Sequence, residues 1–277
     1  MDTVIAVILW SIAILVILYL MMIMPRMLQK ADVKPFAGVL YAHRGLHDNE
    51  SPAPENSMTA FAKAAEAGFG IELDVQLTKD WVPVVFHDYK LERVCGVEGK
   101  VYDYTYEELQ QFHLCKSQEK IPRFEEVLKL VDGKVPLIVE LKIENIDASL
   151  CPVVDKLLQN YKGAYCIESF NPLGVLWYRR NRPEIMRGQL ADAFHSSGEL
   201  KGLLYFMLEN LLFNFLTRPD FVAYNHKNAN KLSRRLCRGL YRNTAVAWTI
   251  KSEEELEQAR EHFDMFIFDS FIPVRHS

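Results

Sequence analysis

Acidic side chains alternate with apolar ones in a stretch that could form a short strand. Glu72 and Asp74 lie in the sequence IELDV at 71–75, and Glu140 precedes Lys142 by two positions at the end of another apolar run. Side chains at alternate positions of a strand project from the same face. Carboxylate oxygens are the ligands that calcium and magnesium prefer, and a lysine ammonium can contact a phosphate. The pattern indicates a divalent cation site beside a phosphate-binding group.

Two histidines also follow apolar runs, and each is next to a charged residue. His43 precedes Arg44, and His87 precedes Asp88. Because histidine titrates near neutral pH, such a pair can divide the work of general acid and general base. The planar guanidinium of Arg44 suits a phosphate diester. The residue types do not decide which histidine is the acid and which is the base.

These side chains need a scaffold in which strand ends converge. Apolar β-rich runs alternate with amphipathic helical stretches, which predicts parallel strands with crossover helices, an α/β fold. Candidate strands are 39–43, 71–76, 83–87, 137–141, 165–169, 185–190, 221–224, 245–250 and 265–269. The link 77–82 is too short for a parallel crossover, so the second and third candidates are expected to form a hairpin with Phe86 opposite Asp74. Eight strands then remain for a barrel. Helices are expected at 57–67, 106–112, 124–131, 151–159 and 253–262.

The N-terminal segment differs in kind from the rest. No charged residue occurs from Val4 to Met24, and about 20 helical residues match the roughly 30 Å hydrocarbon core of a bilayer. No basic residue precedes this run, which favours a transmembrane anchor at 1–25 over a cleaved signal peptide. A juxtamembrane linker at 26–38 and a barrel domain at 39–277 follow, with an excursion at about 89–120. Arg26, Lys30 and Lys34 after the apolar run predict a single-pass membrane protein whose catalytic domain is cytoplasmic.

Composition narrows the range of partners. A formal net charge of -4 and a pI near 6.1 give no basic excess, so nucleic acid is not an expected partner. The five cysteines are scattered without a CxxC pair, which indicates neither a disulfide framework nor a thiolate zinc site.

Together these motifs resemble the glycerophosphodiester phosphodiesterase family, over about Tyr41 to Pro273. The shared segments, in order, are HRG at 43–45, PEN at 54–56, IELD at 71–74, LTKD at 77–80, HD at 87–88, IP at 121–122, ELK at 140–142, SF at 169–170, WT at 248–249 and FD at 268–269. The resemblance implies a TIM-type (β/α)8 barrel preceded here by one N-terminal transmembrane helix. It also implies one divalent cation, calcium or magnesium, and hydrolysis of glycerophosphodiesters to glycerol 3-phosphate and an alcohol.

The resemblance also implies a role for each matched residue. Glu72, Asp74 and Glu140 would be the metal ligands, His43 and His87 the acid and base, Arg44 and Lys142 the phosphate contacts, and Glu55 and Trp248 further substrate-binding groups. One departure is Trp81, which stands where the family usually has a glycine in the turn after TKD. This puts the expected turn geometry in question.

Three functions are compatible with these features. The first is hydrolysis of glycerophosphodiesters, with lysophospholipid substrates and membrane lipid as further expected partners. The second is a lysophospholipase D-like activity on the same scaffold. The third is a catalytically inactive, membrane-tethered binding protein, which the presence of every implied ligand and both histidines disfavours. The apolar segment 202–216 is expected either as a helix buried against the barrel or as an interfacial helix on lipid.

Overall fold

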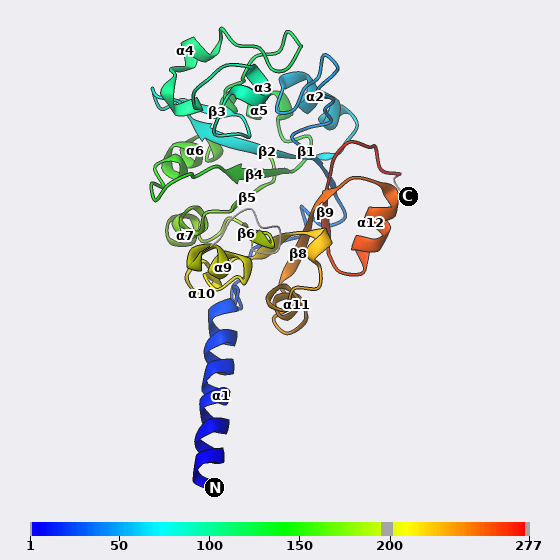
Figure 1. Ribbon diagram of the computed structural model, residues 1–277. Coiled ribbons are helices and arrows are strands. Elements are labelled where there is room, and N and C mark those ends of the chain that lie inside the picture. Colours follow the sequence, from blue (N-terminus) through cyan, green and yellow to red (C-terminus); the bar gives the residue numbers. More distant parts are fainter. Residues whose placement is uncertain (1, 195–201, 275–277) are drawn as a thin grey trace.

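The fold is a closed parallel barrel, seen in a computed structural model that describes residues 2–194 and 202–274. The strands are β1 (Leu40–His43), β2 (Gly70–Leu77), β3 (Pro83–Val85), β4 (Leu137–Leu141), β5 (Tyr165–Ser169), β6 (Arg187–Ala191), β7 (Phe221–Asn225), β8 (Thr244–Ile250) and β9 (Met265–Phe268). Their order is β1-β9-β8-β7-β6-β5-β4-β2-β3, and β1 also pairs with β2, which closes the barrel (Figure 1). All pairs are parallel except β2 with β3. The predicted eight-stranded TIM-type barrel is confirmed.

The hairpin of β2 and β3 has the predicted register. Val75 pairs with Val85, and the amide of Phe86 donates to the carbonyl oxygen of Asp74 at 2.9 Å. Trp81 does adopt the left-handed conformation, with φ of 65°, which costs a residue with a Cβ roughly 1–2 kcal/mol. The turn is held by Thr78, whose carbonyl accepts from the Trp81 amide and whose hydroxyl accepts from the Val82 amide. The turn between β2 and β3 therefore forms although Trp81 replaces the usual glycine, and the indole of Trp81 is exposed.

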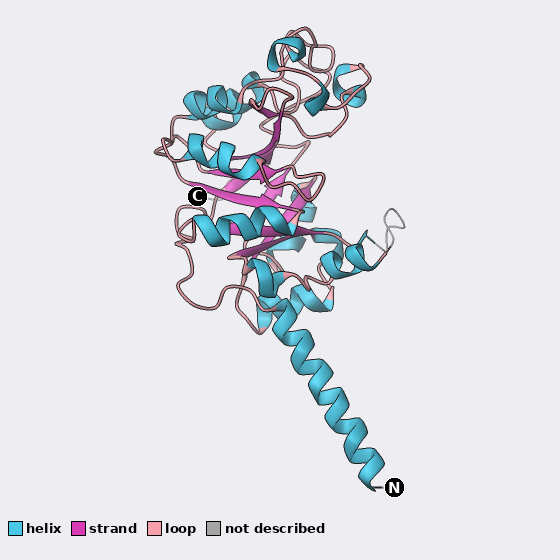
Figure 2. Ribbon diagram, turned by 90° about the vertical axis from the view of Figure 1, so that its left-hand side faces the viewer, coloured by secondary structure: helices cyan, strands magenta, loops and turns pink. Residues whose placement is uncertain are grey.

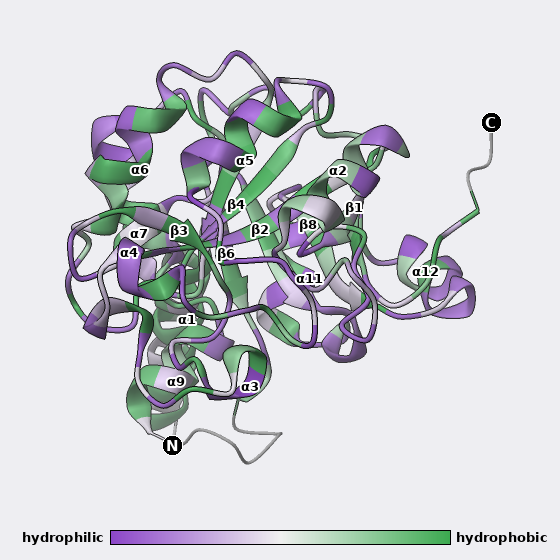
Figure 3. Cartoon of the chain, turned by 90° about the horizontal axis from the view of Figure 1, so that it is seen from above, coloured by the Kyte–Doolittle hydropathy of each residue, from purple (hydrophilic) through white to green (hydrophobic). Residues whose placement is uncertain are grey.

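Helices surround the barrel. The helices of the described residues are α2 (Met58–Glu66), α3 (Glu92–Cys95), α4 (Tyr106–Leu109), α5 (Phe124–Val131), α6 (Leu150–Leu158), α7 (Pro172–Asn181), α9 (Leu203–Glu209), α10 (Asn214–Thr217), α11 (Leu232–Gly239) and α12 (Glu253–Arg260), together with α1 (Asp2–Ile23), which projects away from the barrel. Each of the five expected helices is present. The hydroxyl of Ser57 caps α2 by accepting from the amide of Ala60 at 3.1 Å. The helices α5 and α6 show a hydrophilic and a hydrophobic side, as expected for helices that cover a barrel (Figure 3).

The strands have two different faces. Alternate side chains such as Leu73 and Val139 point outward and join the core beneath the helices. The intervening side chains point into the barrel, and at its N-terminal end they form a second apolar cluster that includes Ile138 and Phe221. Phe36, from the segment expected as a linker, is buried in this second cluster. The chain before β1 therefore packs against the N-terminal end of the barrel.

The helix α1 leaves the domain and is exposed along most of its length (Figure 2). In the described residues it is the one helix long and apolar enough to cross a membrane. Its last turn packs on the barrel, where Ile23 is fully buried and the Ile23 carbonyl accepts a hydrogen bond of 3.0 Å from the Asn214 side chain of α10. Just beyond the helix, Arg26 forms an ion pair of 3.3 Å with Asp220.

The segment 202–216 is partly exposed and partly buried, and contact of its exposed part with lipid stays a prediction. Leu203 and Leu204, in the first turn of α9, are 74% and 55% exposed. In contrast, Leu211 and Asn214 are buried, the second of them at the start of α10. The segment follows β6, and its second helix, α10, contacts the end of α1, the helix that could span a bilayer (Figure 1).

Candidate active site

Three carboxylates converge inside the barrel toward the C-terminal ends of its strands. Glu72 and Asp74 come from β2 and Glu140 from β4, and the strand register places Asp74 beside Glu140. One oxygen of each lies within 4.8 Å of the others, and all three side chains are buried. The predicted ligand set is therefore brought together, with the alternation along β2 directing both of its acids into the barrel.

Burial and the neighbouring charges act differently on the carboxylates of this acidic cluster. Burial, and then repulsion by Asp74 and Glu140, raises the pKa of Glu72 well above its usual range. Burial also raises the pKa of Asp74, but His87, Lys142 and Arg44 outweigh it and hold that pKa well below the usual range. The Oδ1 atom of Asp74 is buried and accepts no hydrogen bond within the described residues. Three clustered oxygen donors with an unsatisfied acceptor fit a hard divalent cation.

Two cationic side chains border the carboxylates. The guanidinium of Arg44 donates to Glu55 at 2.7 Å and lies 3.6 Å from Asp74. The ammonium of Lys142 lies 3.0 Å from Glu140 and 3.6 Å from Asp74. Both predicted phosphate contacts, together with Glu55, are therefore at the acidic cluster. Their ion pairs hold them in place before any substrate binds.

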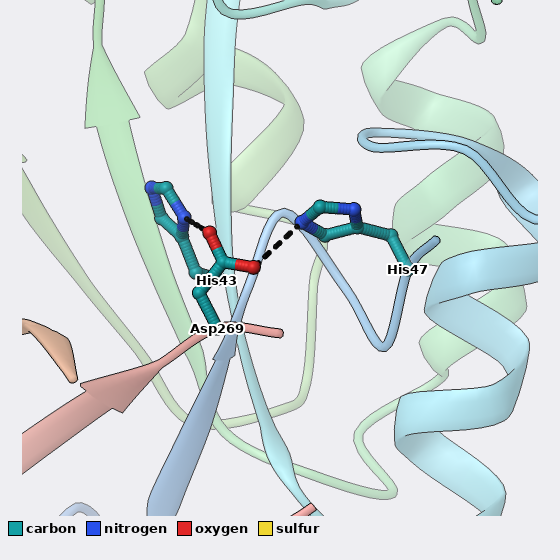
Figure 4. A group of neighbouring side chains, drawn as sticks. All are labelled: His43, His47 and Asp269. Atoms are coloured by element: carbon teal, nitrogen blue, oxygen red, sulfur yellow. Dashed lines mark hydrogen bonds and ion pairs between the residues drawn. The ribbon is translucent and has the colours of Figure 1, made fainter. Parts of the chain in front are cut away.

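His43 is held between the acidic cluster and a further carboxylate. Its Nε2 lies 3.9 Å from Glu72, and its Nδ1 lies 3.0 Å from Oδ2 of Asp269 (Figure 4). Burial and the neighbouring Arg44 lower the pKa of His43 to about 4, so the ring is neutral at pH 7. Asp269 belongs to a matched motif, but no role was predicted for it. Its contact with a histidine nitrogen is the orienting carboxylate familiar from catalytic histidines.

His87 is more exposed and is tied to the excursion at 89–120. Its Nδ1 lies 2.5 Å from Asp88. Arg93 of α3 donates to both oxygens of Glu55 at 2.7 Å and to Asp88 at 2.6 Å. The sequence did not single out Arg93, since nothing in its neighbourhood marks it. The excursion thus supplies a cation that joins the His87 side of the site to Glu55.

Glu168 is another residue that the sequence analysis missed. It lies on β5 in register with Glu140, is 1% exposed, and its Oε2 has no hydrogen-bond partner in the described part of the chain. Burial, followed by repulsion from Glu140 and Asp74, raises its pKa well above the usual range. The signal that could have identified it was a lone acidic residue near the end of the predicted strand YCIES at 165–169.

Trp248 lies on a different wall of the barrel. It is on β8, three strands from β2 in one direction and four strands from β4 in the other. Its ring meets Phe170 edge to face with centroids 5.6 Å apart, and it packs beside the interior apolar cluster. The structure therefore places Trp248 apart from the two strands that carry the acidic cluster, and its role in binding substrate stays a prediction.

A closed parallel barrel with ionisable groups gathered toward the C-terminal strand ends defines a TIM-barrel enzyme. Residues 43–264 match the glycerophosphoryl diester phosphodiesterase family. A glycerophosphodiester phosphodiesterase of Caldanaerobacter subterraneus is 30% identical over 237 residues, 79% of this chain and 88% of that protein. A glycerophosphodiester phosphodiesterase of Bacillus altitudinis is 43% identical over 113 residues. This match covers 38% of this chain and 45%, less than half, of that protein. The chain belongs to the glycerophosphoryl diester phosphodiesterase family, whose members are phosphoric diester hydrolases.

Solved structures agree with this fold. A phosphodiesterase of Oleispira antarctica, in complex with the product sn-glycerol-3-phosphate, has a TM-score of 0.67 and 23% identity. The match covers 84% of this chain and 93% of the chain in that structure. A glycerophosphodiester phosphodiesterase of Thermotoga maritima has a TM-score of 0.64 and 25% identity. The match covers 83% of this chain and 93% of the chain in that structure.

Proposed function

We propose that the protein hydrolyses glycerophosphodiesters to glycerol 3-phosphate and an alcohol with the help of one divalent cation, calcium or magnesium. The observation that carries this proposal is the convergence of Glu72, Asp74 and Glu140 within 4.8 Å, between two cations and beside His43. Family membership supports the substrate class. So does the related structure in complex with sn-glycerol-3-phosphate.

The residues of the site divide the work. Glu72, Asp74 and Glu140 would hold the cation, whose positive charge stabilises the charge that develops on the phosphoryl group. Arg44 and Lys142 bind the remaining phosphoryl oxygens.

His43 and His87 move the protons. Asp269 fixes the ring of His43 with Nε2 toward the carboxylates, which is the atom that exchanges a proton. His87 serves the other side of the reaction, so that one histidine takes a proton from the nucleophile and the other gives one to the leaving alcohol. Glu55 and Trp248 are proposed to contact the glycerol part of the substrate.

The test is product release by the full chain in detergent. Glycerophosphocholine should yield sn-glycerol 3-phosphate when calcium or magnesium is present, with little product in a chelator. Lysophosphatidylcholine is the matched second substrate, because a lysophospholipase D-like enzyme would convert it to lysophosphatidic acid. Absence of product from both substrates, with either metal, would favour the inactive binding protein.

We also propose that the enzyme is a single-pass membrane protein with an anchor at 1–25, a linker at 26–38 and a cytoplasmic barrel domain at 39–277. The exposed apolar surface of α1 supports the anchor. The first turn of α9, with Leu203, Leu204 and the half-exposed Phe206, would lie on the same bilayer. The contact of the neighbouring α10 with the end of α1 supports this arrangement, which brings diesters carrying an acyl chain to the site.

Vesicle binding by a shortened chain tests this second proposal. A chain beginning at Tyr19 keeps the last turn of α1, which packs on the barrel, but lacks the span. We expect it to sediment with anionic vesicles, and the double change of Leu203→Ser and Leu204→Ser to release it, because burial of apolar surface contributes about 25 cal/mol per Å². Ile146→Ser is the control, since Ile146 is 91% exposed elsewhere on the domain. Equal sedimentation of all three chains would refute the role of α9.

A further inference from the structure

The two ring nitrogens of His43 face two different clusters. Nε2 faces Glu72 at 3.9 Å, whereas Nδ1 faces Asp269 at 3.0 Å. The other oxygen of Asp269 lies 3.2 Å from Nε2 of His47. Figure 4 shows the Asp269 carboxylate between the two imidazole rings. His43, His47 and Asp269 each offer one ligand atom, and these three atoms lie within 4.8 Å of one another.

The ring of His47 approaches the Asp269 carboxylate, with Nε2 at 3.2 Å from Oδ1. Both of its ring nitrogens are buried and lack a hydrogen-bond partner within residues 2–194 and 202–274. Buried polar atoms are nearly always satisfied by a partner, water or an ion, so the ring of His47 has the capacity to bind one of these. His47 is not among the groups that the proposed reaction uses.

The cluster can be reached from outside the barrel. A surface cavity of about 630 Å³ is lined by residues that include His47, Asp48, Asn49 and Asp269. The side chains of His43, His47 and Asp269 are 18%, 13% and 13% exposed. A metal ion held by these three groups would therefore keep a position open to solvent, as three-ligand sites do.

We propose that His43 Nδ1, His47 Nε2 and the Asp269 carboxylate form a second, inhibitory metal site of the zinc type. Two imidazole nitrogens and one oxygen suit Zn²⁺, while calcium and magnesium favour the all-oxygen cluster of Glu72, Asp74 and Glu140. Zn²⁺ bonds of about 2.0–2.2 Å at tetrahedral angles place ligand atoms roughly 3.3 Å apart. Oδ2 of Asp269 lies 3.0 Å from His43 Nδ1 and Oδ1 lies 3.2 Å from His47 Nε2, so each imidazole has one carboxylate oxygen near this spacing.

The inhibition follows from the protons of His43, and so rests on the proposed function. A neutral imidazole carries one proton. If Zn²⁺ takes the lone pair of Nδ1, that proton must be on Nε2, the nitrogen that faces the acidic cluster. Nε2 can then no longer accept a proton. The ion also replaces the contact through which Asp269 orients the ring.

The experiment titrates Zn²⁺ into the full chain in detergent with calcium held in excess. Two quantities are measured: hydrolysis of glycerophosphocholine, and zinc binding by competition with a chromophoric chelator. The wild type should bind one Zn²⁺ and lose activity in parallel, and a tenfold increase in calcium should not restore it. His47→Asn should keep its activity without zinc and bind Zn²⁺ at least about 10-fold more weakly. His113→Asn, a histidine elsewhere in the chain, should behave as the wild type.

Three results would overturn the site. They are inhibition that calcium relieves, equal zinc affinity in the wild type and His47→Asn, and failure of the wild type to bind zinc. Thermal unfolding of His47→Asn without zinc checks its fold, and His47→Gln replaces it if it does not fold. The zinc competition needs no turnover. If glycerophosphocholine proves not to be a substrate, weaker zinc binding by His47→Asn would still support the site, although the proposed function would have failed.

Discussion

The two ends of the barrel interior are filled by opposite kinds of side chain. At the N-terminal end, Ile138, Phe221 and Met265 form an apolar cluster that Phe36 joins from the segment before β1. One layer further along the same strands, Glu140 replaces the apolar pattern, and Asp74 and Glu168 lie beside it in register. Both layers are buried. Packing alone stabilises the apolar layer, whereas the buried carboxylates also need neighbouring positive charges.

The difference shows where this fold gives up stability for chemistry. Buried carboxylates near one another are unfavourable, and the raised pKa values of Glu72 and Glu168 express that cost. The apolar end supplies the rigid base on which such a layer can persist, in the way that TIM barrels separate stability from catalysis. Changes at the two ends should therefore have separable effects.

The largest of these effects is expected for His87→Ala. If His87 exchanges a proton with substrate, its removal should lower kcat about 10²- to 10⁴-fold. Its side chain is 31% exposed, so the melting temperature should change little. His226→Ala is the control, because His226 lies on the η2 turn (His226–Asn228) beside Glu255. Near-normal turnover of His87→Ala on glycerophosphocholine would remove His87 from the mechanism.

Phe36→Ala should lower stability strongly and change kcat little, the reverse of the effect expected for His87→Ala. Phe36 is 4% exposed within the apolar cluster, and truncating a buried phenylalanine typically costs about 3–5 kcal/mol of unfolding free energy. Chemical denaturation should show that loss, whereas kcat per folded molecule stays near the wild-type value. A Phe36→Ala protein of unchanged stability would contradict the role given to the segment before β1.

A smaller effect is expected for Arg93→Gln, which loosens the acidic end without removing a reacting group. Arg93 holds Glu55 and Asp88, so we expect kcat to fall roughly 10-fold, as for other groups that orient ligands. Although burial raises the pKa of Glu55, its bonds with Arg93 and Arg44 lower that pKa from 4.5 to about 2.

The lowered pKa of Glu55 gives the same variant a pH signature. Glu55 contributes stability that is present above pH 4.5 and is lost as the pH falls toward 2. The unfolding free energy of Arg93→Gln should therefore depend less steeply on pH in this window. Identical pH profiles for the variant and the wild type would show that Arg93 does not tune Glu55.

The same contrast explains what the sequence could predict. Alternation along a strand identified Glu72, Asp74 and Glu140, and counting across a short turn gave the pairing of Asp74 with Phe86. Both rest on local geometry that a strand imposes on its sequence. Arg93 and His47 could not be placed this way, because their partners Glu55 and Asp269 are 38 and 222 residues away. Only the closed barrel brings those pairs together.

The helices α7 and α11 were missed for a similar reason. The helix α7 begins with Asn171 as its cap and Pro172 at its first turn, a start signal that was available, but its apolar residues come first and its polar residues last, without a clear stripe. The helix α11 is mostly polar and basic, and it packs through the buried Ser233, Arg234 and Cys237. Its position depends on tertiary contacts, such as the hydrogen bond that the Arg234 side chain donates to the Ala229 carbonyl.

The most direct test of the account measures metal content and turnover on the same sample. The full chain is stripped with a chelator, titrated with calcium or magnesium, and assayed for bound metal and for release of glycerol 3-phosphate from glycerophosphocholine. We predict one cation per chain, activity that rises with its occupancy, and loss of both in Asp74→Asn with the fold retained. Full turnover by the stripped enzyme, or normal metal binding by Asp74→Asn, would contradict the assignment of the acidic cluster as the catalytic metal site.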